Sequence, residues 1–215
     1  PKFDETRPVS LTLVENDTSK VSSLESGISR GQSYANASIA ARDMVSEPAN
    51  VLHPTKLAEI ATEIASAGGL DIEILEAADC EALEMGAYIG VSLGSHQPPK
   101  FIHMTFEGDA SNPDNNLWIV GKGITFDSGG ISLKGGAGMG AMKGDMSGGA
   151  AAIASMQAIA ELKPNLNVHM VCAATENMPG GGAQRPGDVV IAMGGKSIEV
   201  DNTDAEGRLT LADAI

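Results

Sequence analysis

The sequence predicts an α/β fold: a layered domain with a central mixed, largely parallel sheet flanked by helices. Strand-like and helix-like apolar patterns alternate along the chain, and some strand-like segments are apolar on both faces, as in residues 166–173 (LNVHMVCA). An alanine-rich segment at residues 148–162 is apolar nearly all round, which is typical of a helix packed between a sheet and another element. Sheets covered by helices on both faces show these patterns.

The first third of the chain predicts one strand and two helices. Residues 9–14 alternate between polar and apolar side chains, as in a strand, and residues 16–19 resemble a turn. Apolar residues then recur at helical spacing over residues 24–45, so we expect a long helix that ends at the Glu-Pro pair 47–48. A second helix is expected over residues 54–69, because it opens with proline and closes with a glycine pair.

The rest of the chain alternates between the two kinds of element. Helices are expected at residues 77–85 and 148–162, and an apolar helical pattern occupies residues 209–215. Further strands are expected at residues 70–75, 100–106, 117–120, 166–173 and 189–193. The stretch at residues 121–130 (GKGITFDSGG) is rich in glycine and polar residues, so we interpret it as a loop that follows a strand.

Composition makes several classes of protein poor candidates. The chain has 215 residues with 42% hydrophobic content, which is enough for a substantial core. Asp and Glu total 28 against 14 Lys and Arg, a formal net charge of −14, so neither nucleic acid nor an anionic membrane is an expected partner. No apolar run approaches the roughly 20 residues that span a bilayer. The two cysteines offer no disulfide framework, and we expect a cytoplasmic protein.

Two polar tracts contain candidate metal ligands. The run NTDAEGRL at residues 202–209 places two carboxylates and a guanidinium within five consecutive residues. The tract at residues 121–130 adds a lysine and an aspartate, and Lys134 and Asp145 follow it. Both tracts follow expected strands, and ligands in α/β sheets bind beyond the carboxyl ends of strands. Carboxylates gathered in one cleft, without matching arginines, are explained by divalent cations that hold them together.

Other interpretations of these tracts are weaker. A solvated turn explains either tract alone about as well, but not both together. The glycines do not follow a phosphate-binding spacing. Structural zinc is not indicated, because cysteines and histidines at short spacing are missing, and Ser128 lacks the surroundings of a nucleophile elbow. The four histidines stand alone in sequence, and His169, within a core-like strand, is interpreted as structural. Oxygen ligands favour Mg²⁺ or Mn²⁺, or a dinuclear site that also accepts Zn²⁺.

The two tracts resemble the leucyl aminopeptidase family, the dinuclear-metal cytosol aminopeptidases. The octapeptide NTDAEGRL is the signature of that family, and VGKGITFDSGG at residues 120–130 also resembles it, as do Lys134 and Asp145. The resemblance extends from about Ala41 to the end of the chain. It implies a metal-dependent aminopeptidase that hydrolyses N-terminal residues, with a preference for leucine, from unblocked peptides by means of a metal-bridging water.

The resemblance also implies a role for each candidate residue. It implies two divalent metal ions, Mn²⁺ or Zn²⁺, and a catalytic pair in which Lys134 steadies the oxyanion and Arg208 holds a bicarbonate ion. The implied metal ligands are Asp127 and Glu206 bridging both ions, Lys122 and Asp145 completing one site, and Asp204 serving the other. A lysine ligand is chemically reasonable because a metal competes with the proton.

The resemblance gives expectations for domains and partners as well. We expect residues 1–20 to be the tail of a missing N-terminal domain, residues 21–46 a linker helix, and residues 47–215 an incomplete metallopeptidase catalytic domain. A homo-hexamer is implied for the full-length protein. We expect the 215-residue chain by itself to be weakly active or inactive. The alternative to an active aminopeptidase is a catalytically silent binding or regulatory member of the same fold. A third interpretation is a metal-dependent phosphatase or nuclease. It is disfavoured because the histidines and the cationic clamp usually needed for phosphoryl groups are missing.

Overall fold

Helices and strands alternate in the computed structural model, which describes residues 10–215. The α-helices are α1 (Val21–Ser46), α2 (Pro54–Gly68), α3 (Ala77–Ala82), α4 (Gly86–Ser92), α5 (Ser147–Leu162) and α6 (Glu206–Ala214). The strands are β1 (Asp71–Leu75), β2 (Lys100–Phe106), β3 (Asn116–Asp127), β4 (Asn167–Asn177), β5 (Val189–Ile191) and β6 (Ser197–Glu199). Short 3-10 helices are η1 (Thr18–Lys20), η2 (Met139–Gly144) and η3 (Thr203–Ala205).

The central sheet has four strands in the order β1-β2-β4-β3. Strands β3 and β4 pair in parallel, whereas β2 pairs antiparallel with both β4 and β1. The expectation of a mixed sheet is confirmed. Strands β1, β3 and β4 run in the same direction, and β2 runs opposite to them. Because β2 lies between β1 and β4, the parallel pairing in this sheet is the one between β3 and β4. The expectation "largely parallel" therefore holds for the direction of the strands and not for their pairing.

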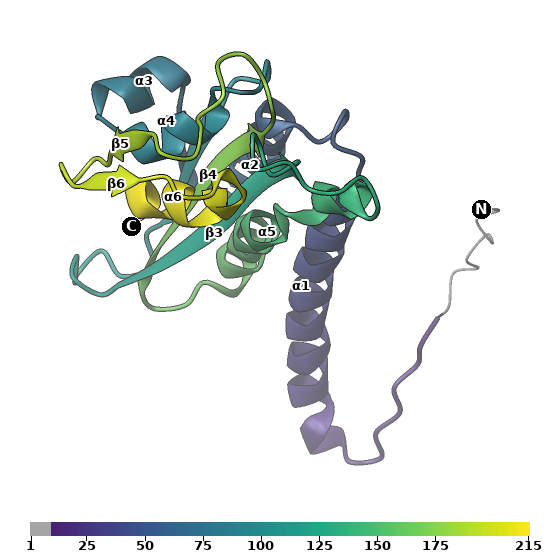
Figure 1. The fold of residues 1–215 in the computed structure, drawn as a ribbon. Helices are drawn as coiled ribbons and strands as arrows, with labels where there is room; N and C mark the ends of the chain where they lie inside the picture. The colour runs from purple at the N-terminus through teal and green to yellow at the C-terminus, as the bar shows by residue number, and fades with distance from the viewer. Residues whose placement is uncertain (1–9) are drawn as a thin grey trace.

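Helices cover both faces of this sheet (Figure 1). On one face α1, α2 and α5 bury a large apolar cluster that includes Leu57, Ile102 and Met170. On the other face α3, α4 and α6 cover a smaller cluster around Tyr88 and Phe101. The expected α/β layers are therefore confirmed, and burial of the apolar side chains on both faces is what stabilises them.

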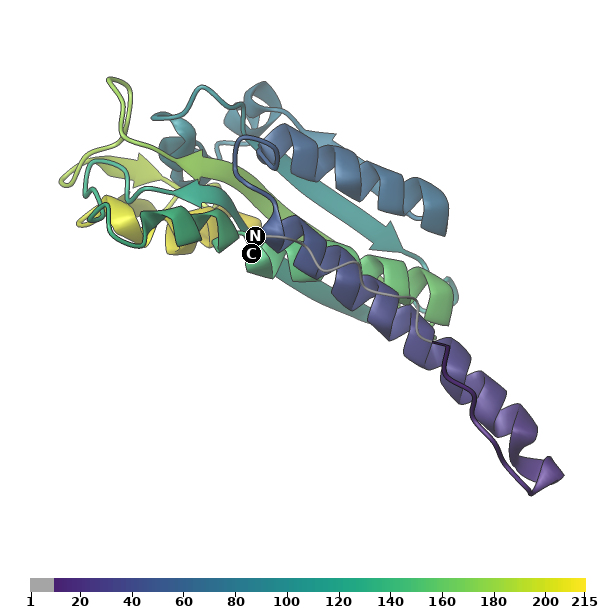
Figure 2. The same ribbon diagram turned by 90° about the vertical axis from the view of Figure 1, so that its right-hand side faces the viewer.

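The long helix expected near the start of the chain is confirmed as α1, and α2 ends at the expected glycine pair, with Gly68 as its last residue and Gly69, which has a φ of 65°, as its cap. The first turns of α1 project beyond the rest of the molecule (Figure 2), and Ser33 is the first of its residues to be buried. That α1 links two domains stays a prediction.

The glycine-rich tract was expected to be a loop, but most of it is strand, because β3 continues to Asp127. Two glycines explain the difference. A Cβ on Gly121 would lie 2.7 Å from Cα of Gly149, and one on Gly149 would lie 2.7 Å from Sγ of Cys172. The glycines thus let α5 approach the sheet closely, and their role is packing, not chain reversal. Lys122 consequently lies within strand β3.

Three other expectations need correction. A strand was expected at residues 9–14, but residues 10–14 form no strand, and Leu11 and Val14 are exposed. No neighbouring strand in the described part of the chain supplies backbone partners for them. Residue 9 lies outside the described residues. The strand expected at 189–193 is shorter, because β5 ends at Ile191; it pairs with β6 in a separate hairpin, whose turn contains Gly195 with a φ of 76°.

The third correction concerns the helix expected at residues 77–85. It ends at Ala82, because Glu84 adopts a φ of 59°, and α4 then begins as a separate helix. Of the residues that the structure describes, none belongs to a helix with the length and apolar character needed to cross a membrane.

Candidate metal centre

Strand β3 supplies the first half of the centre. Asp127 is the last residue of β3, and its carboxylate accepts a hydrogen bond from the backbone N–H of Gly129 (2.9 Å). Gly129 and Gly130 have φ values of 89° and 67°, so the chain can turn sharply here and the carboxylate lies at the carboxyl end of the sheet. Lys122 lies five residues earlier on the same strand.

The octapeptide supplies the second half through η3 and the start of α6. The side chain of Asn202 caps this turn by accepting a hydrogen bond from the N–H of Asp204 (2.9 Å). The hydroxyl of Thr203 donates to the carbonyl of Gly129 (2.7 Å), which fixes the octapeptide against the turn after β3. Glu206 opens α6 and is 1% exposed. A carboxylate at a helix N-terminus is electrostatically favourable.

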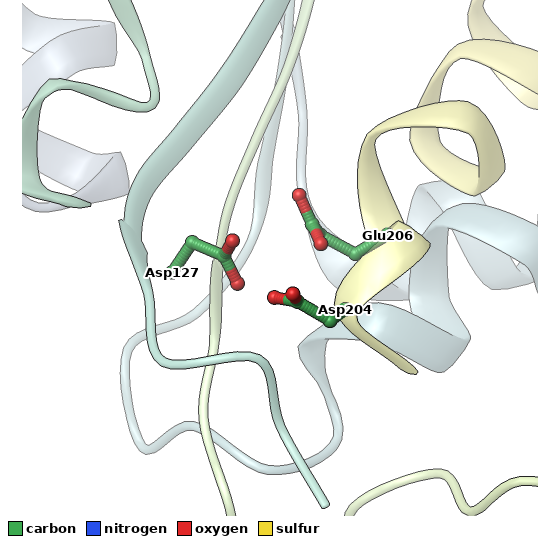
Figure 3. Close-up of side chains that lie close together, drawn as sticks. All are labelled: Asp127, Asp204 and Glu206. Atoms are coloured by element: carbon green, nitrogen blue, oxygen red, sulfur yellow. The ribbon is translucent and has the colours of Figure 1, made fainter. Parts of the chain in front are cut away.

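The carboxylates of Asp127, Asp204 and Glu206 point toward one another (Figure 3). One ligand oxygen from each of the three lies within 4.8 Å of the others. Two lysines and a fourth carboxylate complete the group. The ion pairs are Lys122 Nζ with Asp145 Oδ2 (2.8 Å) and Glu206 Oε1 (2.7 Å), and Lys134 Nζ with Asp127 Oδ2 (2.8 Å) and Asp204 Oδ1. We call these six side chains the carboxylate–lysine centre.

The charges in this centre do not balance. Burial on its own would lower the pKa of Lys122, but the ion pairs with the carboxylates of Asp145 and Glu206 outweigh it, so its pKa is raised. Lys134 follows the same pattern. Burial raises the pKa of Asp145, and the neighbouring Lys122 only partly offsets that effect. Four carboxylates against two ammonium groups leave an excess of negative charge that a bound cation would neutralise.

The donor set fits divalent cations. Oxygen atoms from carboxylates are ligands for Mg²⁺ and Mn²⁺, and a lysine nitrogen can join them once it loses its proton. Asp145 Oδ2 is buried, and although Lys122 Nζ lies 2.8 Å away, it forms no hydrogen bond of acceptable geometry. A buried carboxylate oxygen without such a bond is costly unless another partner is supplied. The centre therefore suits divalent metal binding better than it suits two lysines alone.

The structure does not bring Arg208 into the centre. Its side chain is exposed, and among residues 10–215 it takes part in no ion pair. It lies two residues after Glu206 in the first turn of α6. The other six residues that the sequence singled out, Lys122, Asp127, Lys134, Asp145, Asp204 and Glu206, do come together.

Sequence reasoning missed Asn177, which joins the two halves of the centre. Asn177 ends β4 and is in register with Asp127 on the parallel neighbour β3. Its Nδ2 group donates to Asp127 Oδ1 (2.8 Å) and to the carbonyl of Thr203 (3.0 Å), with a longer contact to Glu206 Oε2 (3.4 Å). The signal that could have found it is its position at the carboxyl end of the strand next to β3.

Known proteins resemble this chain over most of its length. A family model described as "Cytosol aminopeptidase family, catalytic domain" matches residues 39–215. A "Probable cytosol aminopeptidase" of Gloeobacter violaceus is 53% identical over 208 residues, covering 94% of this chain and 41% of the relative. One from a Synechocystis strain is 49% identical over 212 residues, covering 98% of this chain and 42% of the relative.

A solved structure is similar as well. The chain matches "Bottromycin maturation enzyme BotP in complex with Mn" with a TM-score of 0.83 and 40% identity, covering 88% of this chain and 41% of that one. The chain thus spans about two fifths of the length of the curated relatives and of this structure.

Proposed function

The chain belongs to the cytosol aminopeptidase family, and from this premise we propose that the protein is a metallo-aminopeptidase of the leucyl aminopeptidase type. It would remove N-terminal residues, leucine preferentially, from unblocked peptides. The observation that carries the proposal is the carboxylate–lysine centre, in which β3 and the start of α6 contribute side chains that are about 80 residues apart in sequence yet in direct contact.

We propose two divalent ions, Mn²⁺ or Zn²⁺, as the cofactors. Asp127 and Glu206 would be shared by both ions, Lys122 and Asp145 would complete one site, and Asp204 would serve the other. The contacts of Lys122 with Asp145 and Glu206 support this grouping, as does the approach of Asp204 to the two shared carboxylates. When bound, the ions would supply Lewis acidity and a bridging water with a lowered pKa.

The side chains of this chain would do the remaining work. Lys134 contacts Asp127 and Asp204, so its ammonium group lies beside the ligand carboxylates. From there it would stabilise negative charge that develops on the oxygen of the scissile carbonyl. Arg208 is exposed on the first turn of α6, where it would hold a bicarbonate ion close to Glu206. A free α-amine suits this acidic site, because its nitrogen can act as a ligand or pair with a carboxylate, and blocking removes that ability.

We propose in addition that the full-length protein is a cytoplasmic homo-hexamer, as the family resemblance implies. Because the chain spans 41–42% of the length of those relatives, assays require the full-length protein. We expect the 215-residue chain alone to show little or no activity.

The test compares chromogenic substrates. We expect the full-length protein with Mn²⁺ to hydrolyse leucine p-nitroanilide, to leave N-acetyl-leucine p-nitroanilide intact, and to lose activity in EDTA. p-Nitrophenyl phosphate is the matched substrate for the phosphatase alternative. Activity on the phosphate ester alone would overturn the proposal, and metal binding without hydrolysis of any aminoacyl substrate would favour a silent member of the family.

A further inference from the structure

A second cluster of potential ligands lies on the face of the sheet opposite α5. His103 and Thr105 come from β2 and His169 comes from β4, where Thr105 and His169 are register partners. Trp118 on β3 is the register partner of His169 from the other side. The proposed peptidase uses none of these residues.

Three donor atoms in this cluster form a nearly equilateral triangle. His103 Nε2 lies 3.3 Å from His169 Nδ1, and Thr105 Oγ1 lies 3.3 Å from the former and 3.2 Å from the latter. Each of these atoms can present a lone pair. The contacts can also be hydrogen bonds, because an N–H of one ring can donate to Thr105 Oγ1 while the Thr105 hydroxyl donates to the other ring. One cation could be bound by all three atoms together.

The separations match those around a small transition-metal ion. Ligands bound to Zn²⁺ at 2.0–2.1 Å in a tetrahedron lie about 3.3–3.4 Å from one another. Two further side chains lie around the triangle. Trp118 stacks on His169 with a centroid distance of 4.2 Å and an interplanar angle of 14°. Glu73 Oε2 lies 3.9 Å from Nδ1 of His103, the ring nitrogen outside the triangle. At this distance the carboxylate attracts the ring electrostatically without a direct hydrogen bond, on the side where many metal-bound histidines have their outer partner.

The cluster is accessible to ions in solution. The side chain of His103 is 27% exposed, and Trp118 is 55% exposed. A water molecule could therefore provide a fourth ligand. The donors of this cluster differ in kind from those of the carboxylate–lysine centre. Imidazole suits Zn²⁺, Cu²⁺ and Ni²⁺, whereas carboxylates suit Mg²⁺ and Mn²⁺.

We propose that His103, His169 and Thr105 bind one divalent transition-metal ion of the Zn²⁺, Cu²⁺ or Ni²⁺ class, at a site separate from the carboxylate–lysine centre. The bound ion links β2 to β4. We call these three residues the histidine cluster. This site is independent of the proposed aminopeptidase activity, so either proposal can fail without the other.

Trp118 provides the measurement, because it is the only tryptophan in the sequence and stacks on a proposed ligand. The full-length protein, first saturated with Mn²⁺, is titrated with Cu²⁺ while the emission of Trp118 is followed in a version without other tryptophans. We expect saturable quenching with one equivalent of Cu²⁺. The variants His103→Ala and His169→Ala should each lose it, and Glu73→Gln should weaken the apparent affinity by about tenfold.

Two controls separate this site from others. His96→Ala removes an exposed histidine outside the cluster and should quench like the parent, as should Asp204→Asn, which alters the carboxylate–lysine centre. Quenching that persists in both cluster histidine variants, or that never saturates in the parent, would overturn the proposal.

A second measurement covers the case in which a histidine variant fails to fold. Thr105→Val keeps the side-chain shape but removes the oxygen, so its Cu²⁺ affinity should fall while its circular dichroism is unchanged. The electron paramagnetic resonance spectrum of the Cu²⁺ complex should show coupling to two imidazole nitrogens. A spectrum with oxygen ligands alone would contradict the site.

Discussion

The carboxylate–lysine centre and the histidine cluster lie toward opposite ends of the same sheet. Asp127 and Asn177 are in register at the carboxyl ends of β3 and β4, whereas Trp118 and His169 are in register near the other ends. Trp118 and Lys122 are four residues apart on β3, which is about 13 Å along a strand. One sheet thus carries two groups of ligands that are too far apart to share an ion.

The two groups differ in donors and in surroundings. The carboxylate–lysine centre uses oxygen donors from several segments, and hydrogen bonds from Asn177 and Thr203 hold those segments together. The histidine cluster uses donors from two neighbouring strands, with Trp118 stacked on His169 and Glu73 near His103. The donor atoms determine which ion is preferred, and the number of segments that an ion joins determines how far binding stabilises the fold.

The largest effect is expected from Asp204→Asn. The variant should lose one equivalent of bound metal, and turnover should fall by about 100-fold or more, because a Lewis acid contributes several kcal/mol to the transition state. Asp201→Asn is the matched control, since Asp201 is an exposed aspartate three residues earlier. Metal analysis and leucine p-nitroanilide kinetics measure both effects. Unchanged metal content in Asp204→Asn would remove this residue from the ligand set.

Mn²⁺ should stabilise the protein through the carboxylate–lysine centre alone. At 100 times its Kd, a ligand that binds only the folded state adds about 2.7 kcal/mol, which corresponds to a rise in Tm of roughly 5–10 °C for a domain of this size. Differential scanning fluorimetry with Mn²⁺ and with EDTA gives the shift. His169→Ala should keep it and Asp204→Asn should reduce it. If the two variants lost it equally, the two clusters would not be independent.

Much of the fold could be predicted from the sequence, because local patterns specify it. Strand β2 has the predicted bounds 100–106, and α2 begins at the predicted Pro54. The octapeptide and the residues around Asp127 were found because their side chains are chemically unusual in sequence. That they lie together is a structural finding, while their roles as ligands stay predictions.

Other features could not be predicted, because they depend on contacts between distant segments. The glycines of β3 resembled a loop until Gly149 was seen to pack against Gly121. Asn177 is an ordinary residue in sequence, and its importance comes from its register with Asp127. His103 and His169 stand alone in the sequence and were not candidates, although strand pairing brings their rings within 3.3 Å of each other.

Removal of the Asn177 side chain should weaken metal binding by roughly 10–100-fold, as is typical when a partner behind the ligands is lost. Asn177→Ala would leave Asp127, Glu206 and the carbonyl of Thr203 without a shared donor. Isothermal titration with Mn²⁺ measures the affinity. Asn116→Ala is the control, because Asn116 is an exposed asparagine at the other end of β3. Equal affinities in the two variants would show that Asn177 does not position the ligands.

The smallest effect is expected from Gly121→Ala, which tests whether the close packing of α5 affects the two clusters differently. The added methyl group would meet the backbone of Gly148 and Gly149 at less than 3.0 Å, and overpacking of this kind costs about 1–2 kcal/mol of folding free energy. Gly194→Ala is the control, because a Cβ there meets nothing within 4 Å. Urea unfolding measures the difference in stability.

The same variant should also separate the two ligand groups. Lys122 follows Gly121 directly, so a shift of β3 away from α5 would displace a proposed ligand and weaken Mn²⁺ binding. The histidine cluster lies, like Lys122, on the face of the sheet away from α5, but nearer the other end of the strands, and its two ligand strands, β2 and β4, do not include Gly121. Cu²⁺ quenching should therefore be unchanged. If Gly121→Ala weakened Cu²⁺ and Mn²⁺ binding alike, the two groups of ligands would be coupled through the sheet. Their donor atoms alone would then not explain the difference in the ions that they bind.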